Sequence, residues 1–447
     1  MSEANEWVPL SSVLSAIVDN RGKSVPTVES GFPLIATNCI KENRIYPTFE
    51  NIRYVSEETL NSWFRAHLEP NDILFVNKGT PGRVCLVPDP VSFCAAQDMI
   101  GFRVDSSKID YRYLFAFLRS DWVKQTIANN HVGLVIPHFR KQDLDTLSVP
   151  MPSRSEQVKI GELYLQLSEK IEINHRINTE LEGMAKLLYD YWFVQYDFPL
   201  SAAQAAALGQ PHLTGQPYRS SGGPMVYNTQ LKREIPKGWK VGSLTHLGEI
   251  VGGSTPSTKE IAFFTDHGTP WITPKDLSRN VGNKFITRGQ TDLTESGVKS
   301  ASLAVLPPGS VLMSSRAPIG YTAINRIPVT TNQGFKSFVP SKGYPVEFVY
   351  HTLNHLMGVI EQNASGSTFK EISTGALKAI HNVLPDADII ASYQAVVAPM
   401  FQQQDTLEQQ NQELTTLRDW LLPMLMNGQV RVGCSESAES RQKGGAK

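Results

Sequence analysis

The sequence predicts an α+β protein in which two globular domains are separated by two long, antiparallel coiled-coil helices. An internal repeat with pseudo-two-fold character is the first observation behind this prediction. Residues 133–152 match residues 366–385 without a gap in their apolar pattern, 233 positions later. The same offset places "NTEL" from Asn178 on "NQEL" from Asn411. Each half of the chain is therefore expected to be a globular domain followed by a long helix.

Composition shifts divide the chain at the ends of these segments. Residues 201–224 are rich in Ala, Gly, Ser and Pro, which is typical of a linker or a long loop. The expected parts are a first domain (1–152), a central helix (153–199), a linker (200–230), a second domain (231–386), a C-terminal helix (387–433) and a disordered tail (434–447).

The globular parts are expected to be mostly β. "DILFV" and "RVCLV" are short strand-like runs on either side of "NKGTPG", which has the turn chemistry of a hairpin. "VLMSS" and "YTAI" repeat this arrangement around "RAPIG". Residues 111–120 and 345–357 have helical character. Each domain is therefore expected to combine short strands with short helices.

The long helices carry the second observation, a 4-3 spacing of apolar residues sustained for more than four heptads from Ile160. Amides in both seams are expected to fix register at a cost in stability. Arg418 interrupts the second seam, and Pro399 is expected to kink that helix or to mark its start. The residues expected to pair the helices or dock a partner are Ile160, Leu167, Ile171, Asn174, Asn178, Leu181, Leu188, Trp192, Phe193, Met400, Gln404, Leu407, Asn411, Leu414, Leu421 and Leu425.

An alternative interpretation is that the two segments are ordinary amphipathic helices, each packed on its own domain. About 40 residues of helix extend roughly 60 Å, which is longer than a domain of this size needs. The helices are therefore interpreted as a spacer, paired with each other. The aromatic cluster at residues 189–198 is expected to pack the helix end on a neighbouring domain, to contact a partner, or both.

Composition excludes several classes of protein. The 447 residues are 41% hydrophobic and 19% charged, and no apolar run reaches the roughly 20 residues that span a bilayer. The N-terminus does not resemble a signal peptide, and the four cysteines form no CxxC pair, so a cytoplasmic protein without a disulfide framework is expected. Residues 231–385 carry 16 Lys and Arg against 10 Asp and Glu, a net of +6, which suits contact with phosphate.

No catalytic constellation is found in the sequence. No lysine has Asp or Glu two positions before it, so this half of a common nuclease motif is missing. The NPPY or DPPY motif of amino-methyltransferases and the GxSxG motif are also absent. "RGKS" from Arg21 lacks the glycine that opens a phosphate-binding loop. His351 and His355 have the i, i+4 spacing of metal ligands, but no third ligand is evident, so a surface or packing role is favoured and no metal is expected.

The layout resembles the specificity subunits of type I restriction–modification systems. The resemblance is carried by "NTELEGMAKLLYDYWFVQYDF" from Asn178, "LRDWLLPMLMNGQV" from Leu417 and "EIPKGWKVGSL" from Glu234. "PWITPKDL" and "PVTTNQGFKSFV" in the second half add to it, and it extends over about residues 7–433. The first domain departs from the pattern, with "KGTPGR" and "CAAQDM" where the second has "RAPIGY" and "TTNQGF".

The resemblance implies a non-catalytic subunit with two target recognition domains, each of which reads half of a split, asymmetric sequence in double-stranded DNA. It also implies two modification (methyltransferase) subunits docked on the helices, and restriction (translocase and endonuclease) subunits that join through them. S-adenosylmethionine, ATP and Mg²⁺ belong to those partners, and no cofactor is expected on this chain. An enzyme acting on DNA through an unrecognised site, such as a nuclease or methyltransferase, and a two-module protein scaffold remain as alternatives.

The repeat also helps to sort the residues expected to contact DNA. Residues shared by both copies cannot distinguish two half-sites, so Lys78 and Arg316, beside Arg83 and Tyr321, are expected to contact phosphate or to be solvated cations. Base readout is expected from stretches that diverge between the copies, through Arg or Lys on guanine and Asn on adenine. The candidates there are Asn38, Lys41, Arg44, Arg140, Lys141, Lys275, Arg279, Lys284, Asn363 and Lys370.

Overall fold

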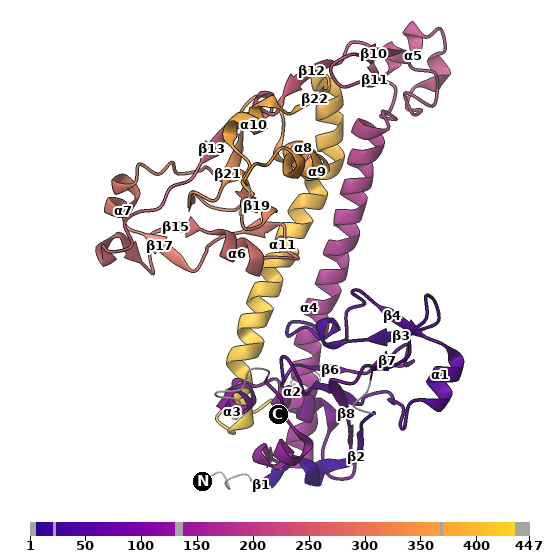
Figure 1. Ribbon diagram of the computed structural model, residues 1–447, viewed down its shortest axis with the longest axis vertical. Coiled ribbons are helices and arrows are strands. Elements are labelled where there is room, and N and C mark those ends of the chain that lie inside the picture. Colours follow the sequence, from indigo (N-terminus) through magenta and orange to yellow (C-terminus); the bar gives the residue numbers. More distant parts are fainter. Residues whose placement is uncertain (1–5, 21–23, 130–136, 367–369, 434–447) are drawn as a thin grey trace, which may run out of the picture. The chain divides into compact units, whose positions relative to one another are not determined.

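A computed structural model describes residues 6–20, 24–129, 137–366 and 370–433 (Figure 1). The chain divides into two compact units, unit 1 (residues 1–174 and 410–447) and unit 2 (residues 175–409). Residues 434–447, for which a disordered tail is expected, lie outside the described residues. Unit 1 therefore joins two segments that are far apart in the sequence, whereas unit 2 is one continuous stretch.

The β-rich part of unit 1, residues 6–151, is here called head 1. Its antiparallel sheet has the order β2-β8-β5-β6, and a three-stranded sheet has the order β4-β3-β7. The elements are β1 (Glu6–Pro9), η1 (Leu10–Val13), β2 (Leu14–Val18), β3 (Phe32–Ile35), η2 (Thr37–Cys39), β4 (Arg53–Val55), α1 (Glu57–Ser62), β5 (Ile73–Val76), β6 (Val84–Leu86), β7 (Cys94–Ala95), β8 (Met99–Val104), α2 (Tyr111–Leu118), α3 (Asp121–Asn129), η3 (Lys141–Thr146) and β9 (Ser148–Met151).

The β-rich part of unit 2, residues 233–384, is here called head 2. Its larger sheet has the order β13-β21-β18-β19-β16, and the smaller has the order β14-β17-β15-β20. The elements are β11 (Arg233–Pro236), β12 (Lys240–Ser243), η6 (Leu244–His246), β13 (Gly248–Gly252), η7 (Ile261–Phe263), β14 (Phe264–Thr265), β15 (Thr269–Ile272), α6 (Pro274–Arg279), β16 (Phe285–Ile286), β17 (Thr291–Leu293), α7 (Glu295–Ser300), β18 (Val311–Ser315), β19 (Ile319–Asn325), β20 (Thr330–Thr331), β21 (Lys336–Pro340), α8 (Val346–His355), α9 (Met357–Gln362), α10 (Thr374–Ala379) and β22 (His381–Leu384).

The repeat is visible in how each head begins and ends. β1 pairs with β9 and β12 pairs with β22, both antiparallel, so a strand near the start of each head lies beside its last strand. β9 and β22 begin at Ser148 and His381, which are 233 positions apart, and each leads into a long helix. The two matched halves therefore share one chain path.

The long helices are α4 (Arg154–Tyr189), which continues into a π-helical turn at Asp190–Val194, and α11 (Ala387–Met426). α11 runs through Pro399 without a break. Within unit 1 the two helices run antiparallel, with Ser168 beside Arg418 and Asn174 beside Asn411. Within unit 2 they do the same, with Asn178 beside Gln404 and Trp192 beside Tyr393.

Helix residues complete the cores of both units. Leu422, Leu425 and Met426 from α11 join Tyr164 of α4 and the residues of head 1 in one apolar cluster. In unit 2, the aromatic cluster of residues 189–198 is buried among residues of head 2 and of α11. Its Phe193 ring lies 4.8 Å from Phe348 and 4.9 Å from Tyr393, between ring centroids. Burial of large aromatic rings is among the strongest stabilising contributions available to a core, so each head depends on helix residues.

The expected α+β class, with short-stranded heads and long helices, is confirmed. The segment 200–230, expected as a linker, instead carries α5 (Ala202–Ala207), η5 (Pro211–Leu213) and β10 (Met225–Asn228). β10 pairs with β11, and Tyr218 is buried in a stack on Phe198. Over the described residues, no helix has the length and apolar character needed to cross a membrane.

Candidate nucleic-acid interface and its attachment to the helices

The two hairpins expected to contact DNA lie in equivalent surroundings. Lys78 follows β5 and pairs through its backbone with His138, and Arg316 follows β18 and pairs in the same way with Glu371. His138 and Glu371 are 233 positions apart, the spacing of the repeat. In each unit the structure thus brings together two stretches singled out in the sequence, the hairpin and the loop before the last strand.

In unit 1, exposed positively charged side chains surround the hairpin that contains Lys78. The side chains of Lys78, Arg140 and Lys141 are exposed, and Lys141 forms an ion pair with Asp19. Arg83 lines a cavity of about 430 Å³ together with residues of α3. Head 1 therefore presents several cations around one hairpin.

In unit 2 an acidic residue accompanies the cations. Glu371 forms ion pairs with Arg316 at 3.5 Å and with Lys336 at 3.7 Å. Lys370 beside it is exposed, and Tyr321 is half-buried in β19. The Ser315 N–H donates to the Gly334 carbonyl at 2.7 Å, which holds the "TTNQGF" stretch against the hairpin. Since the Arg316–Glu371 pair is partly exposed, its geometry leaves the guanidinium accessible to solvent.

The remaining candidates for base readout are spread over both heads. Asn38 is exposed and donates to the Glu50 carbonyl, and Lys41 is ion-paired with the Glu50 carboxylate at 2.7 Å. Lys275 and Arg279 are exposed on α6, and Asn363 is exposed just after α9.

Two residues expected to read bases, Arg44 and Lys284, instead contact a long helix. Arg44 forms an ion pair with Glu172 of α4, with Nη1 and Oε1 2.7 Å apart. Lys284 is only 5% exposed and its ammonium lies 2.5 Å from the Glu182 carboxylate of α4. The expectation that Lys284 reads a base is corrected, because its charge is buried against the helices. Both cations attach a head to a helix of the same unit.

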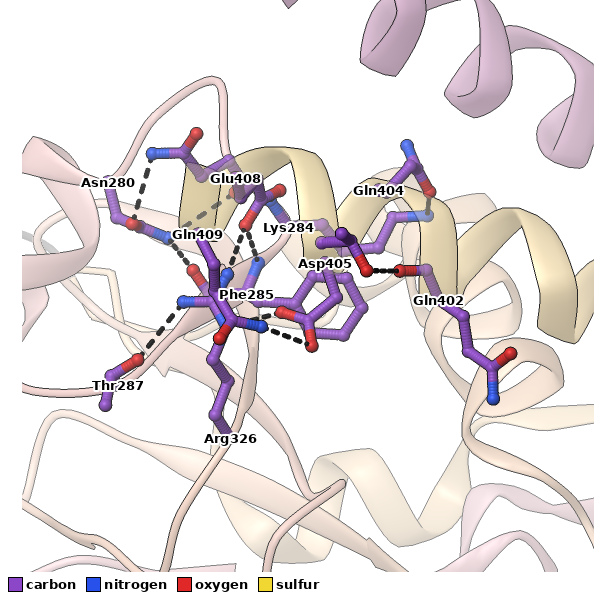
Figure 2. Close-up of polar contacts among 12 residues, drawn as sticks. Asn280, Lys284, Phe285, Thr287, Arg326, Gln402, Gln404, Asp405, Glu408 and Gln409 are labelled. Carbon is purple, nitrogen blue, oxygen red and sulfur yellow. Dashed lines mark hydrogen bonds and ion pairs between the residues drawn. The ribbon is translucent and has the colours of Figure 1, made fainter. Parts of the chain in front are cut away.

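The contact of head 2 with its helices contains several charged groups (Figure 2). The Lys284 ammonium also donates to the Gln404 side chain of α11 at 2.7 Å and lies 3.3 Å from the centre of the Phe401 ring. Burial lowers the pKa of Lys284, which Glu182 opposes. Burial acts to raise the pKa of Glu182, but the nearby Lys284 ammonium acts in the opposite direction. The pKa of Glu182 is lowered overall. The pair is thus held in its charged form by proximity.

Glu408 of α11 accepts hydrogen bonds from the backbone of head 2. Its carboxylate receives the Lys284 N–H at 2.6 Å and the Phe285 N–H at 3.0 Å, and Arg326 Nη2 donates to it at 2.9 Å. Arg326 also forms an ion pair with Asp405, one turn earlier on α11. Burial raises the pKa of Glu408 to about 7, although the two N–H donors lower it. One helix carboxylate therefore holds two successive peptide groups of the head.

Sequence reasoning missed the acidic side of these contacts. Glu172 and Asp405 are 233 positions apart, the offset of the repeat. Each pairs with an arginine of the head in its own unit, Glu172 with Arg44 and Asp405 with Arg326. A search for acidic residues in repeat register on the helices would have found this signal.

The residues expected to pair the helices lie as follows. Asn174 Nδ2 donates to Asn411 Oδ1 at 2.9 Å within unit 1, and Gln404 Nε2 donates to the Asn178 carbonyl at 3.1 Å within unit 2. Arg418 is buried over the Tyr164 ring and donates to Ser168. Ile160, Ile171, Asn174, Asn178, Trp192, Phe193, Gln404, Leu407, Asn411 and Leu425 are buried, and Leu167, Leu181, Leu188, Met400, Leu414 and Leu421 are half-buried.

The two histidines of α8 pack on an aromatic ring. The rings of His351 and His355 lie 5.7 Å and 5.9 Å from that of Tyr189, between centroids. Among the described residues, no group of three or more His, Cys, Asp or Glu side chains is placed to hold a metal. The spacing of the two histidines thus serves packing in this structure.

Comparison with known proteins decides the family. Residues 23–183 and 236–416 each match the family described as the type I restriction modification DNA specificity domain. The chain belongs to this family. The two matches coincide with the two repeats, and each includes most of a head together with most of its following long helix.

Two curated relatives carry names of the same kind. The chain is 36% identical over 198 residues to the type I restriction enzyme MjaIX specificity subunit of Methanocaldococcus jannaschii, covering 42% of this chain but only 45% of that protein. It is 28% identical over 358 residues to the HindI specificity subunit of Haemophilus influenzae, covering 71% of this chain and 77% of that protein. The recognised family is thus found across both halves.

A solved structure shares the fold. The crystal structure of a type I restriction–modification system S subunit from M. genitalium matches with a TM-score of 0.58 and 15% identity, covering 95% of this chain and 97% of that one. At that identity the likeness concerns the fold alone. It supports the arrangement of two β-rich heads with long helices.

The buried ring of His351 predicts a pH dependence of stability in unit 2. Burial lowers the pKa of His351 to about 4, so between pH 6.5 and 4 the unfolded chain binds a proton that the folded chain does not. Stability is therefore lost as the pH falls through this window. At pH 5 the loss is about 2 kcal/mol from this group alone.

Melting temperatures of the wild type and of His351→Gln, measured between pH 7.5 and 5, test this. The wild type should lose more stability on acidification than the variant, whereas His212→Gln at an exposed position should follow the wild type. Glu408 contributes the opposite slope, since its raised pKa adds stability as the pH falls, but it does so in all three proteins. Parallel curves for wild type and His351→Gln would contradict the prediction.

Proposed function

We propose that this chain is the non-catalytic DNA-reading subunit of a type I restriction–modification complex, and that each head reads one half of a split, asymmetric target in double-stranded DNA. The observation that carries the proposal is the duplicated architecture: two matches to one DNA specificity family, each ending in a long helix. Two readers in one chain, with different loops, suit two different half-sites separated by bases that are not read.

The distribution of charge supports a division of labour within each head. Lys78 and Arg316, at corresponding hairpin positions, contact phosphate and set the position of the head. Base readout falls to exposed polar groups that differ between heads, such as Asn38 and Arg140 in head 1 and Lys275 and Arg279 in head 2. Arg44 and Lys284 are left out because their charges are used against the helices.

The helices offer equivalent apolar surfaces for a partner. Leu187 and Trp420 are 66% and 62% exposed, and they are 233 positions apart in the repeat. Met184 and Leu417, also exposed, are related by the same offset and lie one turn earlier on each helix. Paired exposed apolar residues of this size mark interaction sites. Two copies of one surface suit two copies of one partner, the modification subunit.

The chemistry of the complex is assigned to partners. Modification subunits bring S-adenosylmethionine and methylate the target, and restriction subunits join through them with ATP and Mg²⁺. The chain itself positions DNA and partners and holds no cofactor of its own in this proposal. Its place of action is the cytoplasm.

The proposal is tested by mapping methylation genome-wide in cells that carry this chain and its modification subunit. We expect one bipartite, asymmetric motif with a fixed number of unread bases. Cells with the modification subunit alone provide the control and should lack the motif. An uninterrupted motif, or methylation independent of this chain, would contradict the proposal.

Arg316→Ala tests the assignment of a phosphate contact. Affinity of the complex for cognate and scrambled duplexes should fall by a similar factor, and the slope of log affinity against log salt should decrease by about 1. Lys299→Ala, which removes an exposed cation on α7, serves as a control and should change neither value. A loss confined to cognate DNA would instead identify Arg316 as a base reader.

Charge placed on the apolar helix surfaces should change the stoichiometry of the complex. Leu187→Asp or Trp420→Asp alone should leave one modification subunit bound, and the double variant none, because a carboxylate cannot be buried without a partner. Native mass spectrometry of the co-expressed complex measures this. Gln412→Asp, an exposed α11 position, should retain both subunits, and full occupancy in the double variant would place the docking surface elsewhere.

A further inference from the structure

The attachment of head 2 to its helices contains several charged groups that are buried or largely covered. Lys284 and Glu408 are nearly buried and Arg326 is largely covered. Charged side chains are rarely buried unless paired. Replacing a buried ion pair by apolar residues of similar size is often neutral or stabilising, so such a pair is weak support for stability. A geometric role accounts better for these groups.

The contacts differ from apolar packing in that they are directional. Apolar burial is non-directional, so the apolar contact holds a head through the shape of its packed side chains and not through preferred bond directions. Hydrogen bonds weaken steeply away from their preferred distance and angle, and charge-assisted ones are the stronger kind. Glu408 receives two successive backbone N–H groups, which a tilt of the head would separate from it.

The attachment points lie on both helices of unit 2, and Figure 2 shows those on α11. Lys284 reaches Glu182 on α4, whereas Arg326 reaches Asp405 and Glu408 on α11. Lys284 and Arg326 lie at the ends of two neighbouring paired strands, before β16 and after β19. Contacts with two different helices resist a rotation of these strands better than a single contact does. We call these five side chains, Glu182, Lys284, Arg326, Asp405 and Glu408, the clamp.

The clamp connects directly to the surface expected to read DNA. Lys284 follows α6, which carries the exposed Lys275 and Arg279, with only four residues between. Asn280, at the end of α6, donates from Nδ2 to the Phe285 carbonyl at 3.1 Å and so ties the helix to the clamped segment. A change in the angle of this segment would therefore move α6.

Head 1 has a contact of the same kind. Glu172 and Asp405 occupy corresponding positions of the repeat, and each forms an ion pair with an arginine of the head in its own unit, Arg44 in head 1 and Arg326 in head 2. Two arginine–carboxylate attachments whose acids are in repeat register indicate a common requirement of both heads rather than a local accident of packing.

On the basis of the proposed function, we propose that the clamp is a positioning device that makes the complex reject DNA whose unread spacer is one base pair too long or too short. One added base pair rotates a half-site by about 35° and moves it by about 3.4 Å. Without the clamp, the segment that carries α6 would yield more to such a displacement, whereas the clamped segment resists it. Clamp residues thus set specificity for spacer length without contacting DNA.

The test uses the complete complex of this chain with its modification subunits. Methylation rates are measured on duplexes that carry the mapped half-sites with the native spacer, one base pair fewer and one more. In Glu408→Gln and Arg326→Met, the ratio of the methylation rate on the native spacer to the rate on an altered spacer should fall by roughly tenfold, because each variant removes one attachment of the head. The rate on the native spacer should change far less than this ratio.

A matched control distinguishes positioning from loss of structure. Asp292→Asn also removes a buried, ion-paired carboxylate in head 2, but its partner Arg288 lies within the head. It should leave the spacer preference unchanged even if it lowers all rates. If the clamp served only stability, its variants would lower the methylation rates on all three spacers by the same factor. An unchanged ratio of these rates in both clamp variants would therefore overturn the proposal.

Two further outcomes are separable. If Arg326→Met does not assemble, Glu408→Gln and Arg326→Lys, which keep side-chain volume, decide the result by the same ratio. If the wild-type complex methylates no bipartite target, the proposed function fails, and the clamp with it. If the wild type shows one spacer and the variants keep that preference, only the clamp proposal fails.

Discussion

Each unit depends on apolar contact between chain segments that are distant in the sequence. The core of head 1 includes Leu422 and Leu425 from the end of α11, and the core of head 2 includes residues 185–200 from the middle of the chain. Neither head has its complete core until the long helix of the other repeat has been added. Contacts of such sequence separation carry a large loop-closure cost and slow folding, but they also join the two repeats into one structure.

Buried amide side chains between the two long helices lower the stability of the fold but favour one register of the helix pair. Asn174 and Asn411 are both buried, and one of their two possible hydrogen bonds forms, between Nδ2 and Oδ1. Among the described residues, Asn174 Oδ1 and Asn411 Nδ2 find no partner, which costs about 1–3 kcal/mol for each buried polar group. A shift of one helix along the other would break the Asn174–Asn411 hydrogen bond in unit 1 and the Gln404–Asn178 hydrogen bond in unit 2. The observed register is therefore the one in which these buried amides are paired.

The sequence predicted the parts that depend on periodicity and failed where burial decides. The hairpins, the helices at residues 111–120 and 345–357 and the long helices followed from alternation, turn residues and spacing, all local properties. Segment 200–230 was interpreted as a linker because composition alone does not show that Tyr218 stacks on Phe198. That contact joins residues with their neighbours in the fold, and no local pattern records it.

The same limit explains the assignment of Lys284. A lysine in a divergent, basic segment has the composition of a DNA contact, and sequence cannot distinguish an exposed ammonium from one held between Glu182 and Gln404. The acids decide, because a buried cation requires a nearby anion, and both partners of Lys284 lie on helices about 100 positions away in the chain. Pairing cations of a head with acids on the long helices is therefore a better criterion than local charge. It separates groups that hold a head from groups that remain free to meet a ligand.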